Sequence, residues 1–586
     1  MSEQKHYYTD EKNAQIVIAL LKAHGIRKVI ANPGTTNIAI VGSVQNDPYF
    51  QVWSAVDERH AAYMACGMAA ESGEPVVLSC TGATASRNYL PAMTEAYYRK
   101  LPLLVITSSQ PDSHRGHLWA QMIDRRSPPN DTVRYSTQIN IVNSENDAKN
   151  CELEINKAIS ELWRGGGGPV HINLVSSCAR FNTTTLPDVK LVQRVHAWEE
   201  TWPSIRQDSK IAIWIGSHKR FARKEIASLE AFVKSHDAVV LTDHTSSYVG
   251  YGCVNSALAC FQGLKAKTVY SELKPDLIIH IGEVSGDYYS VGFLRGAAPV
   301  WRVSEDGEMR DLFQRLEAVF EMSESMFFLR YAGEVRPTHG FMEAWQRIDA
   351  EVRKSIPDLP FSNIWIQRQL RKFLPSGSEF HMGILNSLRA GNFHRSSPDV
   401  EEWSNVGGFG IDGDVSTAIG ASLCNSKRLY FCVVGDLAFF YDLNSLGNRH
   451  IASNLRILLV NNGTGAEFSL YNHLGNIVFG AENRRFIGAA GHFHDKSPDL
   501  VRHYATDLGF KYLCAKSKEE LLQALPEFVA KEMDKPILLE CFTTPEAESD
   551  ALKSFGNLID HHRSTTDAIK KLVPHGMKHF LRKVVQ

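Results

Sequence analysis

The sequence predicts an α/β protein built from three doubly wound domains, each with a parallel sheet. Short apolar runs of the kind found in buried parallel strands alternate along the chain with stretches long enough to form helices. This alternation is typical of parallel sheets whose strands are connected by helices. A chain of 586 residues is also too long for a single hydrophobic core.

The first predicted domain spans residues 1–185. It begins with a helix over 13–24, a strand over 28–31 and the turn NPGTTN, followed by a strand over 52–56 and a helix over 60–69. Its later strands are the runs PVVLSC, LPLLVITSSQ and PVHINLV. We expect a linker at 183–200, where these apolar runs stop.

The second predicted domain spans 200–345 and the third spans 360–545. The strands of the second domain are the runs KIAIWIGS, AVVLTD, DLIIHIG and APVWRVS, and those of the third are RLYFCVVGD, RILLVNNG and PILLECFTT. Residues 551–586 form a basic, partly amphipathic C-terminal extension. We expect a packed or solvated tail there, with a membrane-surface helix as the alternative.

Composition excludes several classes of function. The chain is 44% hydrophobic and 22% charged, and its net charge of −2 provides no overall field to recruit nucleic acid or membrane. Ten cysteines are scattered without a CxxC pair, which argues against a zinc ribbon or a disulfide framework. The polar N-terminus lacks the apolar core of a signal peptide, and no apolar run is long enough to span a membrane. We therefore expect a cytoplasmic protein.

Two polar residues follow neighbouring predicted strands of the third domain. Asp436 comes directly after the run 429–434, and Asn462 follows the run 457–460. Open α/β sheets bind ligands at the carboxyl ends of their strands. A carboxylate, a side-chain amide and a nearby backbone carbonyl are hard oxygen ligands that suit Mg²⁺. The alternative is a plain strand-to-helix turn in which Asn and Gly serve as loop residues.

A second signal lies near the N-terminus. Glu58 falls where the strand over 52–56 meets the helix over 60–69. A carboxylic acid at such a junction can serve as a positioned proton partner for a bound cofactor. The alternative is a helix N-terminal acid favoured by the helix dipole.

Together these motifs resemble those of thiamine-diphosphate-dependent 2-oxo acid decarboxylases and carboligases, most closely the menaquinone-biosynthesis synthases of the MenD type. The similarity is densest in the segments DERHAAYMACGMAAESGEPVV, FGIDGDVSTAIGAS, GDLAFFYDLNSL and LVNNGTGAEFSL. It implies a pyrimidine-binding first domain, a Rossmann-like middle domain and a diphosphate-binding third domain. It also implies that Asp436, Asn462 and the Thr464 carbonyl hold Mg²⁺, and that Glu58 activates thiamine diphosphate through N1′ of its aminopyrimidine ring.

The resemblance assigns further cofactor contacts. Ile411 matches an apolar residue that props the cofactor in its bent conformation, although ordinary core packing is the alternative. Gln121 matches a glutamine that faces the cofactor, with a helix-surface amide as the alternative. The remaining cofactor-binding candidates are the residues around the two turns: Gly413, Gly435, Leu437 and Ala438.

On the substrate side the chain departs from the family. The Ser-Arg pair that binds the acidic acceptor is replaced by Thr35-Thr36, an arginine by Val406, and an Asn-Ser pair by Ile384-Leu385. Arginine offers a planar fork for a carboxylate, which Thr and Val cannot supply. Arg389 does match a family arginine that holds a substrate carboxylate. Glu467 replaces an apolar residue and faces either substrate or solvent, and Phe468 beside it is a further candidate contact.

The sequence therefore predicts an enzyme that decarboxylates a 2-oxo acid with thiamine diphosphate and Mg²⁺ and adds the product to an unidentified acceptor. Simple decarboxylation and the complete family synthase reaction are the alternatives within this class. Two alternatives lie outside this class. A nucleotide-binding dehydrogenase is disfavoured because no G-x-G-x-x-G motif follows a predicted strand with an acid about 20 residues further on. A non-catalytic homologue would not need Glu58, Asp436 and Asn462 together. The resemblance also implies a homodimer or homotetramer with active sites between subunits.

Overall fold

The computed structural model describes residues 7–177, 180–265, 270–333, 339–492, 497–532, 534–556 and 558. The chain divides into two compact units, one formed by 1–199 with 306–321 and the other by 200–305 with 322–586. Three parallel sheets with interleaved helices confirm the predicted fold class. None of the described helices is long and apolar enough to cross a membrane.

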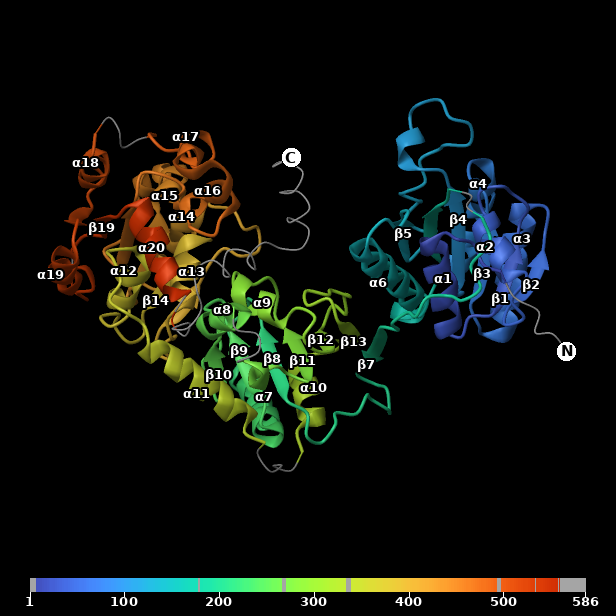
Figure 1. Cartoon of the computed structure of the whole chain (residues 1–586), viewed down its shortest axis with the longest axis horizontal. Coiled ribbons are helices and arrows are strands. Elements are labelled where there is room, and N and C mark those ends of the chain that lie inside the picture. The colour runs from blue at the N-terminus through green and yellow to red at the C-terminus, as the bar shows by residue number, and fades with distance from the viewer. Residues whose placement is uncertain are drawn as a thin grey trace. The chain divides into compact units, whose positions relative to one another are not determined.

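The sheet of the first unit has the strand order β2-β1-β3-β4-β6-β5, and all its pairings are parallel. Helices cover both faces because successive strand residues alternate between them: Val29 packs with α1, α2 and α6, whereas Ile30 packs with α3, α4 and α5 (Figure 1). The strands are β1 (Lys28–Ala31), β2 (Gln51–Ser54), β3 (Val76–Cys80), β4 (Leu103–Ser109), β5 (Tyr135–Ile139) and β6 (Val170–Val175). The helices are α1 (Lys12–Ala23), α2 (Ile38–Val44), α3 (Glu58–Ser72), α4 (Thr84–Asn88), α5 (Leu90–Arg99) and α6 (Glu145–Glu161).

The middle sheet contributes the parallel order β10-β9-β8-β11-β12 to the second unit. Its strands are β8 (Ile211–Ile215), β9 (Val239–Thr242), β10 (Cys253–Asn255), β11 (Leu277–Ile281) and β12 (Val300–Ser304), between helices α7 (Arg223–His236), α8 (Ala257–Lys265), α9 (Tyr288–Leu294), α10 (Glu324–Tyr331) and α11 (Phe341–Lys354). The expected linker at 183–200 contains a strand, β7 (Gln193–His196), which pairs with β13 (Leu316–Glu321) in the first unit.

The third sheet has the parallel order β15-β14-β16-β17-β19-β18. Its strands are β14 (Glu379–Met382), β15 (Glu401–Trp403), β16 (Tyr430–Gly435), β17 (Leu455–Asn461), β18 (Lys511–Ala515) and β19 (Ile537–Phe542). Its helices are α12 (Asn363–Leu370), α13 (Asn386–Asn392), α14 (Asp414–Ser422), α15 (Asp436–Tyr441), α16 (Leu474–Phe479), α17 (Asn483–Phe486), α18 (Leu500–Asp507), α19 (Lys518–Phe528) and α20 (Pro545–Phe555). The predicted C-terminal extension begins within α20, and the rest of it, apart from residues 556 and 558, lies outside the described residues.

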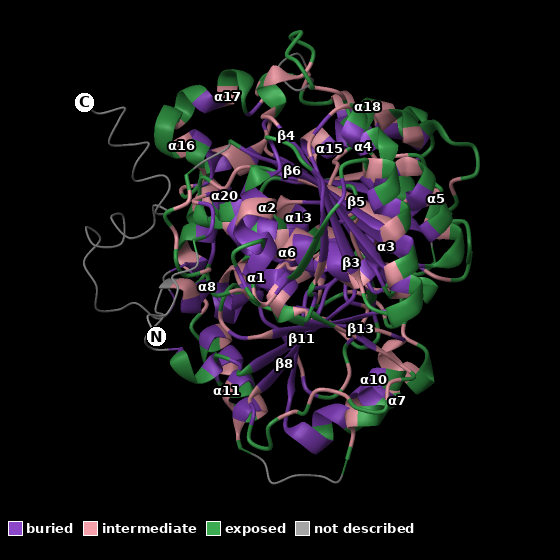
Figure 2. Ribbon diagram, turned by 90° about the vertical axis from the view of Figure 1, so that its right-hand side faces the viewer, coloured by how far each residue is buried: buried purple, intermediate pink, exposed green. Residues whose placement is uncertain are grey.

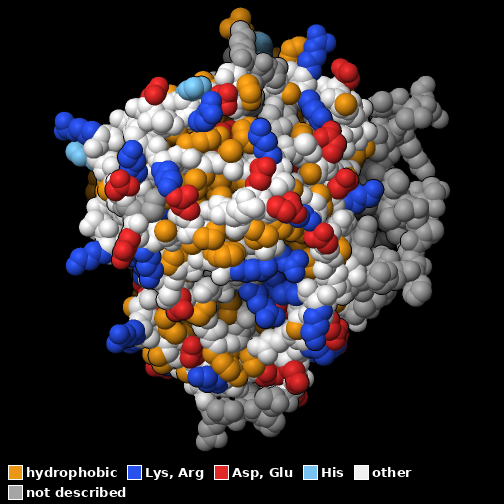
Figure 3. Space-filling view, turned by 90° about the vertical axis from the view of Figure 1, so that its left-hand side faces the viewer, with side chains coloured by type: hydrophobic (Ala, Val, Ile, Leu, Met, Phe, Trp, Pro, Cys, Tyr) orange, Lys and Arg blue, Asp and Glu red, His pale blue; other side chains and the backbone are white. Residues whose placement is uncertain are grey.

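The interior of each domain consists of strands whose residues are almost all buried. Figure 2 shows β3, β4, β6, β8 and β11 as buried, with exposed residues on the outer surfaces of the helices. The surface is mixed in charge: on the face drawn in Figure 3, Lys and Arg side chains lie among Asp and Glu side chains. This mixture agrees with the small net charge of the chain.

Each sheet has an interior point where the chain, after adding strands on one side, continues on the other side. In the first sheet it lies between β1 and β3, because the chain passes from β1 outward to β2 and then returns to the other side. In the third sheet it lies between β14 and β16, and in the middle sheet between β8 and β11. Helices diverge to opposite faces at such a point and leave a crevice in which ligands bind.

The crevice of the middle sheet is closed by its own backbone. The Ser217 amide donates to the Val284 carbonyl at 3.1 Å, and the Glu283 amide donates to the Ser217 carbonyl at 2.8 Å. An ideal Cβ on Gly216 would lie 1.9 Å from the Glu283 carbonyl oxygen. The loops after β8 and β11 therefore touch where a nucleotide-binding domain would hold its ligand. This closure argues against the dehydrogenase alternative.

We predict that Gly216→Ala destabilises the middle domain, because the added methyl group overlaps a backbone carbonyl that no side-chain rotation can move. The cost expected for such overpacking is about 1–3 kcal/mol, visible as a lower first transition in differential scanning calorimetry. Gly292→Ala on α9 is the matched control, since an ideal Cβ there would have Leu264 as its nearest neighbour, at an ordinary 3.7 Å. Equal transition temperatures for both variants would contradict the close approach of the two loops.

Candidate active site

The turn after β16 and the turn after β17 are joined by a hydrogen bond. Strands β16 and β17 pair in parallel with Gly435 opposite Val460, so their carboxyl ends lie side by side. Asp436 is buried, and its Oδ2 accepts from the Gly463 amide at 2.6 Å. Gly463 has a φ of +74°, a conformation that glycine adopts without strain. The structure thus brings together the two segments predicted to form a metal site.

The residues at this point fit a metal-bound diphosphate. The donors are the Asp436 carboxylate, the Asn462 amide, whose Oδ1 accepts from the Thr464 amide at 3.4 Å, and the backbone carbonyls of the same turn. An ideal Cβ on Gly435, Gly463 or Gly413 would meet nothing within 4 Å, so open space lies beside them. Within the described part of the chain, no group of three or more His, Cys, Asp and Glu side chains could hold a metal ion. A metal here would depend on this mixed oxygen set.

Neighbouring positions support this turn. Leu437 and Ala438 lie in the first turn of α15, and the Leu437 amide donates to Asp436 Oδ1 at 2.8 Å. Ile411 is half-buried and packs against the core that lies beneath α14 and α15. This position agrees with core packing and leaves part of the side chain accessible.

The loop after β14 is tied to the start of α14. The Ile384 amide donates to Asp414 Oδ2 at 3.3 Å. Burial raises the pKa of Asp414 to about 7, and the nearby Asp442 and Asp412 carboxylates add to that shift. The segments that carry Ile384, Gly413 and Asp436 therefore converge on the crevice between β14 and β16.

Arg389 and Glu467 form a two-point ion pair at the same edge. Arg389 lies on α13 and its guanidinium donates to both carboxylate oxygens of Glu467, at 2.6 and 2.9 Å. The Glu467 side chain is 20% exposed, and both of its carboxylate oxygens are held by Arg389. Phe468, next to it, packs edge-on against the His473 ring at 5.3 Å between centroids.

In the first unit, Glu58 is the first residue of α3 and is half-buried. The helix start is capped by its neighbour: one carboxylate oxygen of Asp57 accepts from the amides of Arg59 and His60, at 2.8 and 3.4 Å. Because Asp57 already fills the capping position, the Glu58 carboxylate is not required there. This weakens the interpretation of Glu58 as a capping acid.

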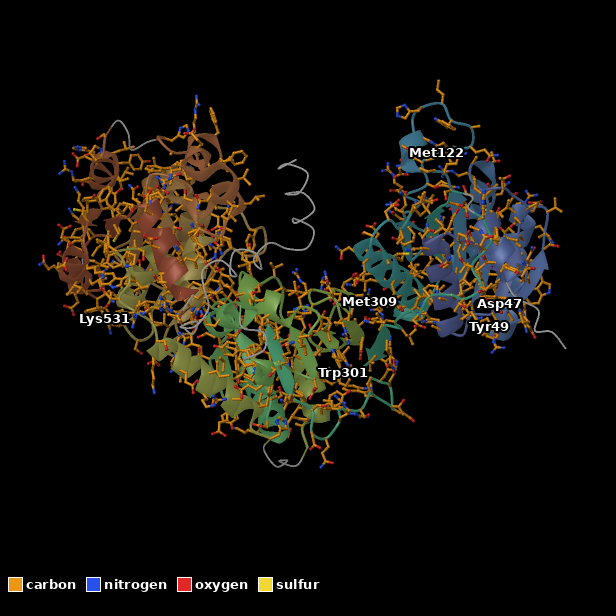
Figure 4. The ribbon with its side chains drawn as sticks, viewed as in Figure 1. Asp47, Tyr49, Met122, Trp301, Met309 and Lys531 are labelled. Atoms are coloured by element: carbon orange, nitrogen blue, oxygen red, sulfur yellow. The ribbon has the colours of Figure 1, made fainter. Side chains whose placement is uncertain are left out.

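The crevice of the first sheet is lined by the turns after β1 and β3. Thr36 is buried, and its hydroxyl bonds the Thr81 hydroxyl and the Ser108 carbonyl, the latter at 3.2 Å. The Thr36 hydroxyl is therefore already hydrogen-bonded within the protein. Gln121 lies in the loop between β4 and β5, not on a helix; Figure 4 marks this loop by Met122. Gln121 is exposed, and its backbone carbonyl oxygen lies 3.1 Å from an ideal Cβ on Gly82.

Sequence reasoning missed Arg125 in this crevice. Only 6% of the residue is exposed, and it donates from Nη2 to the same Ser108 carbonyl at 3.2 Å. Its Nε and Nη1 have no hydrogen-bond partner among the described residues. Burial lowers its pKa below the usual arginine value. A single arginine in a charged segment, DRRSPP, gave no signal that it would be buried.

Four of the ten described non-glycine residues with positive φ lie in the loops beside these two crevices. Ala83 (+56°) and Gln121 (+64°) lie in the first unit, and Leu385 (+65°) and Phe409 (+58°) lie in the second. Such conformations cost about 1–3 kcal/mol each and persist where the surroundings enforce them, often at functional sites. Leu385 belongs to the pair that replaces Asn-Ser.

Comparisons with known proteins agree with this geometry. Residues 11–127 match the family described as thiamine pyrophosphate enzyme, N-terminal TPP binding domain. The chain is 31% identical over 564 residues to the 2-succinyl-5-enolpyruvyl-6-hydroxy-3-cyclohexene-1-carboxylate synthase of Phocaeicola vulgatus, covering 94% of this chain and 98% of that protein. It is 30% identical over 570 residues to the Bacteroides thetaiotaomicron protein of the same name, covering 94% and 99%. The chain belongs to this synthase family.

Membership of the synthase family establishes that this is a thiamine-diphosphate-dependent enzyme of the type that acts on a 2-oxo acid. The predicted resemblance and cofactor are therefore confirmed. The roles of the individual site residues stay predictions, and the geometry above gives each of them a defined place.

We predict that Asp436→Ala abolishes metal-dependent binding of thiamine diphosphate, because a diphosphate held through a metal loses the carboxylate that balances the charge of that metal. Calorimetric titration with thiamine diphosphate, with and without Mg²⁺, measures this. The control is Asp358→Ala, which also removes a carboxylate, from a side chain that is 85% exposed and paired with Lys518. Unchanged affinity in the Asp436 variant would refute the metal assignment.

Proposed function

We propose that this protein decarboxylates a 2-oxo acid with thiamine diphosphate and Mg²⁺. The carbon made nucleophilic by loss of CO₂ would then add to an acceptor that differs from the acidic acceptor implied by the family resemblance. The observation that carries this proposal is the joined turn of Asp436 and Gly463, beside open space at Gly435 and Gly413. The changed acceptor is inferred from the substrate-side residues that depart from the family pattern. The proposal also includes a homodimer or homotetramer.

When bound, thiamine diphosphate supplies the electron sink that takes up the electron pair released as the C1–C2 bond of the 2-oxo acid breaks and CO₂ leaves. Asp436, Asn462 and the Thr464 carbonyl would hold the metal that carries the diphosphate. Glu58 would exchange a proton with N1′ of the aminopyrimidine ring, and Ile411 would support the ring system. With the cofactor bound, the former carbonyl carbon of the donor would become nucleophilic and could form a C–C bond with an acceptor or take a proton.

A changed acceptor is supported by three substrate-side positions, one in the first unit and two in the second. The Thr36 hydroxyl is turned inward to Thr81 and Ser108, and Ile384 and Val406 are buried apolar side chains. None of these positions offers the two-pronged carboxylate contact of an arginine. We therefore favour an acceptor with less negative charge than the acidic acceptor that the family resemblance implies. The buried cation of Arg125 offers a new anion contact near Thr36 in the first unit.

Assembly is supported by the surface around Glu58. All four residues of the edge strand β2 are exposed, and Trp53, Val56 and Tyr63 expose 37%, 84% and 47% of their surfaces. Large apolar side chains gathered beside a functional residue are typical of a protein interface. A second copy of the chain would cover them.

The second candidate is the synthase reaction that gives the relatives their name. The observation in its favour is identity of about 30% along nearly the full length of both chains. The test is to supply 2-oxoglutarate and isochorismate, the acidic acceptor that the family resemblance implies, and to follow the conjugate by mass spectrometry. CO₂ release from other 2-oxo acids is measured in parallel. We expect CO₂ without this conjugate; turnover near the common enzyme median of about 10 per second would establish the second candidate instead.

We predict that Glu58→Gln reduces turnover by about 100-fold or more while thiamine diphosphate still binds, because glutamine can bond N1′ but is a poor proton partner. Hydrogen–deuterium exchange at C2 of the bound cofactor is the direct readout. Glu71→Gln, on the same helix, is the control. Exchange at the unmodified rate in the Glu58 variant would remove Glu58 from the mechanism.

A further inference from the structure

The ion pair of Arg389 and Glu467 is well protected from water. The two side chains are only 13% and 20% exposed, and their N–O distances are 2.6 and 2.9 Å. Arg389 Nη1 also donates to the Asn386 side chain at 3.1 Å. Parallel bonds from Nη1 and Nη2 to one carboxylate are the geometry with which arginine binds a carboxylate ligand. Here the ligand is part of the protein itself.

The pair stands at the crevice that holds the metal turn. Glu467 follows Thr464 by three residues after β17, and Arg389 lies on α13 directly after β14. Strands β14, β16 and β17 are neighbours in the sheet, so these segments share one edge. A substrate bound beside Asp436 and Gly413 would therefore meet this guanidinium from the same side of the sheet.

The Glu467 carboxylate neutralises the positive charge of Arg389 that would otherwise attract a substrate anion. Burial by itself would lower the pKa of Arg389, but the Glu467 carboxylate outweighs burial and raises it above the usual arginine value, so the guanidinium stays protonated. A substrate carboxylate could use Arg389 only by displacing Glu467. That displacement would leave a second carboxylate in a partly buried place without its partner, which is strongly unfavourable.

The surroundings of the pair are aromatic and aliphatic. Tyr288 and Tyr289 of α9 both lie within electrostatic range of Arg389, and the Tyr288 ring lies 5.9 Å from that of Phe409. An ideal Cβ on Gly286 would meet Leu388 and, at 3.6 Å, Val406. Phenol and methyl groups favour an uncharged group over a carboxylate.

Building on the proposed function, we propose that the donor is a 2-oxo acid whose tail, beyond the reacting carbon, carries no charge. Glu467 takes the position that the second carboxylate of a dicarboxylic 2-oxo acid would occupy. The Arg389–Glu467 pair is then a specificity-determining element that excludes donors such as 2-oxoglutarate and admits pyruvate and its longer apolar or hydroxylated relatives.

The test compares donors on the full chain loaded with thiamine diphosphate and Mg²⁺. CO₂ release is followed for pyruvate, 2-oxobutanoate and 2-oxoglutarate. We expect kcat/KM for the better uncharged donor to exceed that for 2-oxoglutarate by about 100-fold, as expected when a buried charge would be left unpaired. Preference for 2-oxoglutarate would overturn the inference and leave the proposed decarboxylation intact.

Variants of the pair show whether the internal carboxylate causes this preference. Glu467→Gln keeps the shape of the side chain and releases the charge of Arg389, so the ratio of 2-oxoglutarate to pyruvate activity should rise by about tenfold or more. The double variant Arg389→Met with Glu467→Leu removes both charges, and its ratio should stay near the original value. Glu546→Gln, which breaks the exposed pair with Arg484, is the matched control. An unchanged ratio in Glu467→Gln would overturn the inference.

Binding of succinate supplies a readout that needs no turnover. Calorimetric titration should show succinate binding to Glu467→Gln and none to the unmodified protein or to the double variant. Absence of CO₂ from every donor would refute the proposed function, and the succinate titration would then decide the inference alone. Equal binding of succinate by the unmodified protein and by Glu467→Gln would overturn it.

Discussion

The parallel pairing of β16 with β17 is the constraint on which the cofactor half of the molecule depends. Parallel strands place their carboxyl ends at one edge, and the register that sets Gly435 opposite Val460 brings the Asp436 carboxylate to the Gly463 amide. A slip of one residue would turn the side chains of β17 to the opposite face of the sheet. The buried apolar side chains of both strands hold the register, so the packing of the core and the geometry of the site share one cause.

The sequence is most informative where strands are buried on both faces. Strands β16 and β17 are continuous apolar runs, so the amino-acid pattern alone locates their ends, and with them Asp436 and Asn462. Strands β5, β15 and β18 escape prediction because they lie at or near sheet edges, and their side chains are mostly half-buried or exposed. Strand β7 resembles a linker in sequence for the same reason. Exposed and half-buried positions in these strands interrupt the apolar runs by which buried strands are recognised.

The substrate side could not be predicted in this way, because its key contact joins distant parts of the chain. Arg389 and Glu467 are separated by 78 positions, and each alone is an ordinary charged residue. Similarity to a family assigns a role to Arg389, but only the structure shows that its two nitrogens already hold a carboxylate. Arg125 also could not be predicted from the sequence. It is a buried guanidinium for which the described part of the chain supplies no carboxylate.

The capping of α3 by Asp57 has a consequence for how this lineage can change. Because Asp57 and not Glu58 accepts from the first amides of the helix, a change at position 58 leaves the helix cap in place. Under the role proposed for Glu58, a single codon change there would remove catalysis and keep this contribution to the folding free energy. Selection on stability alone would not remove such a pseudoenzyme.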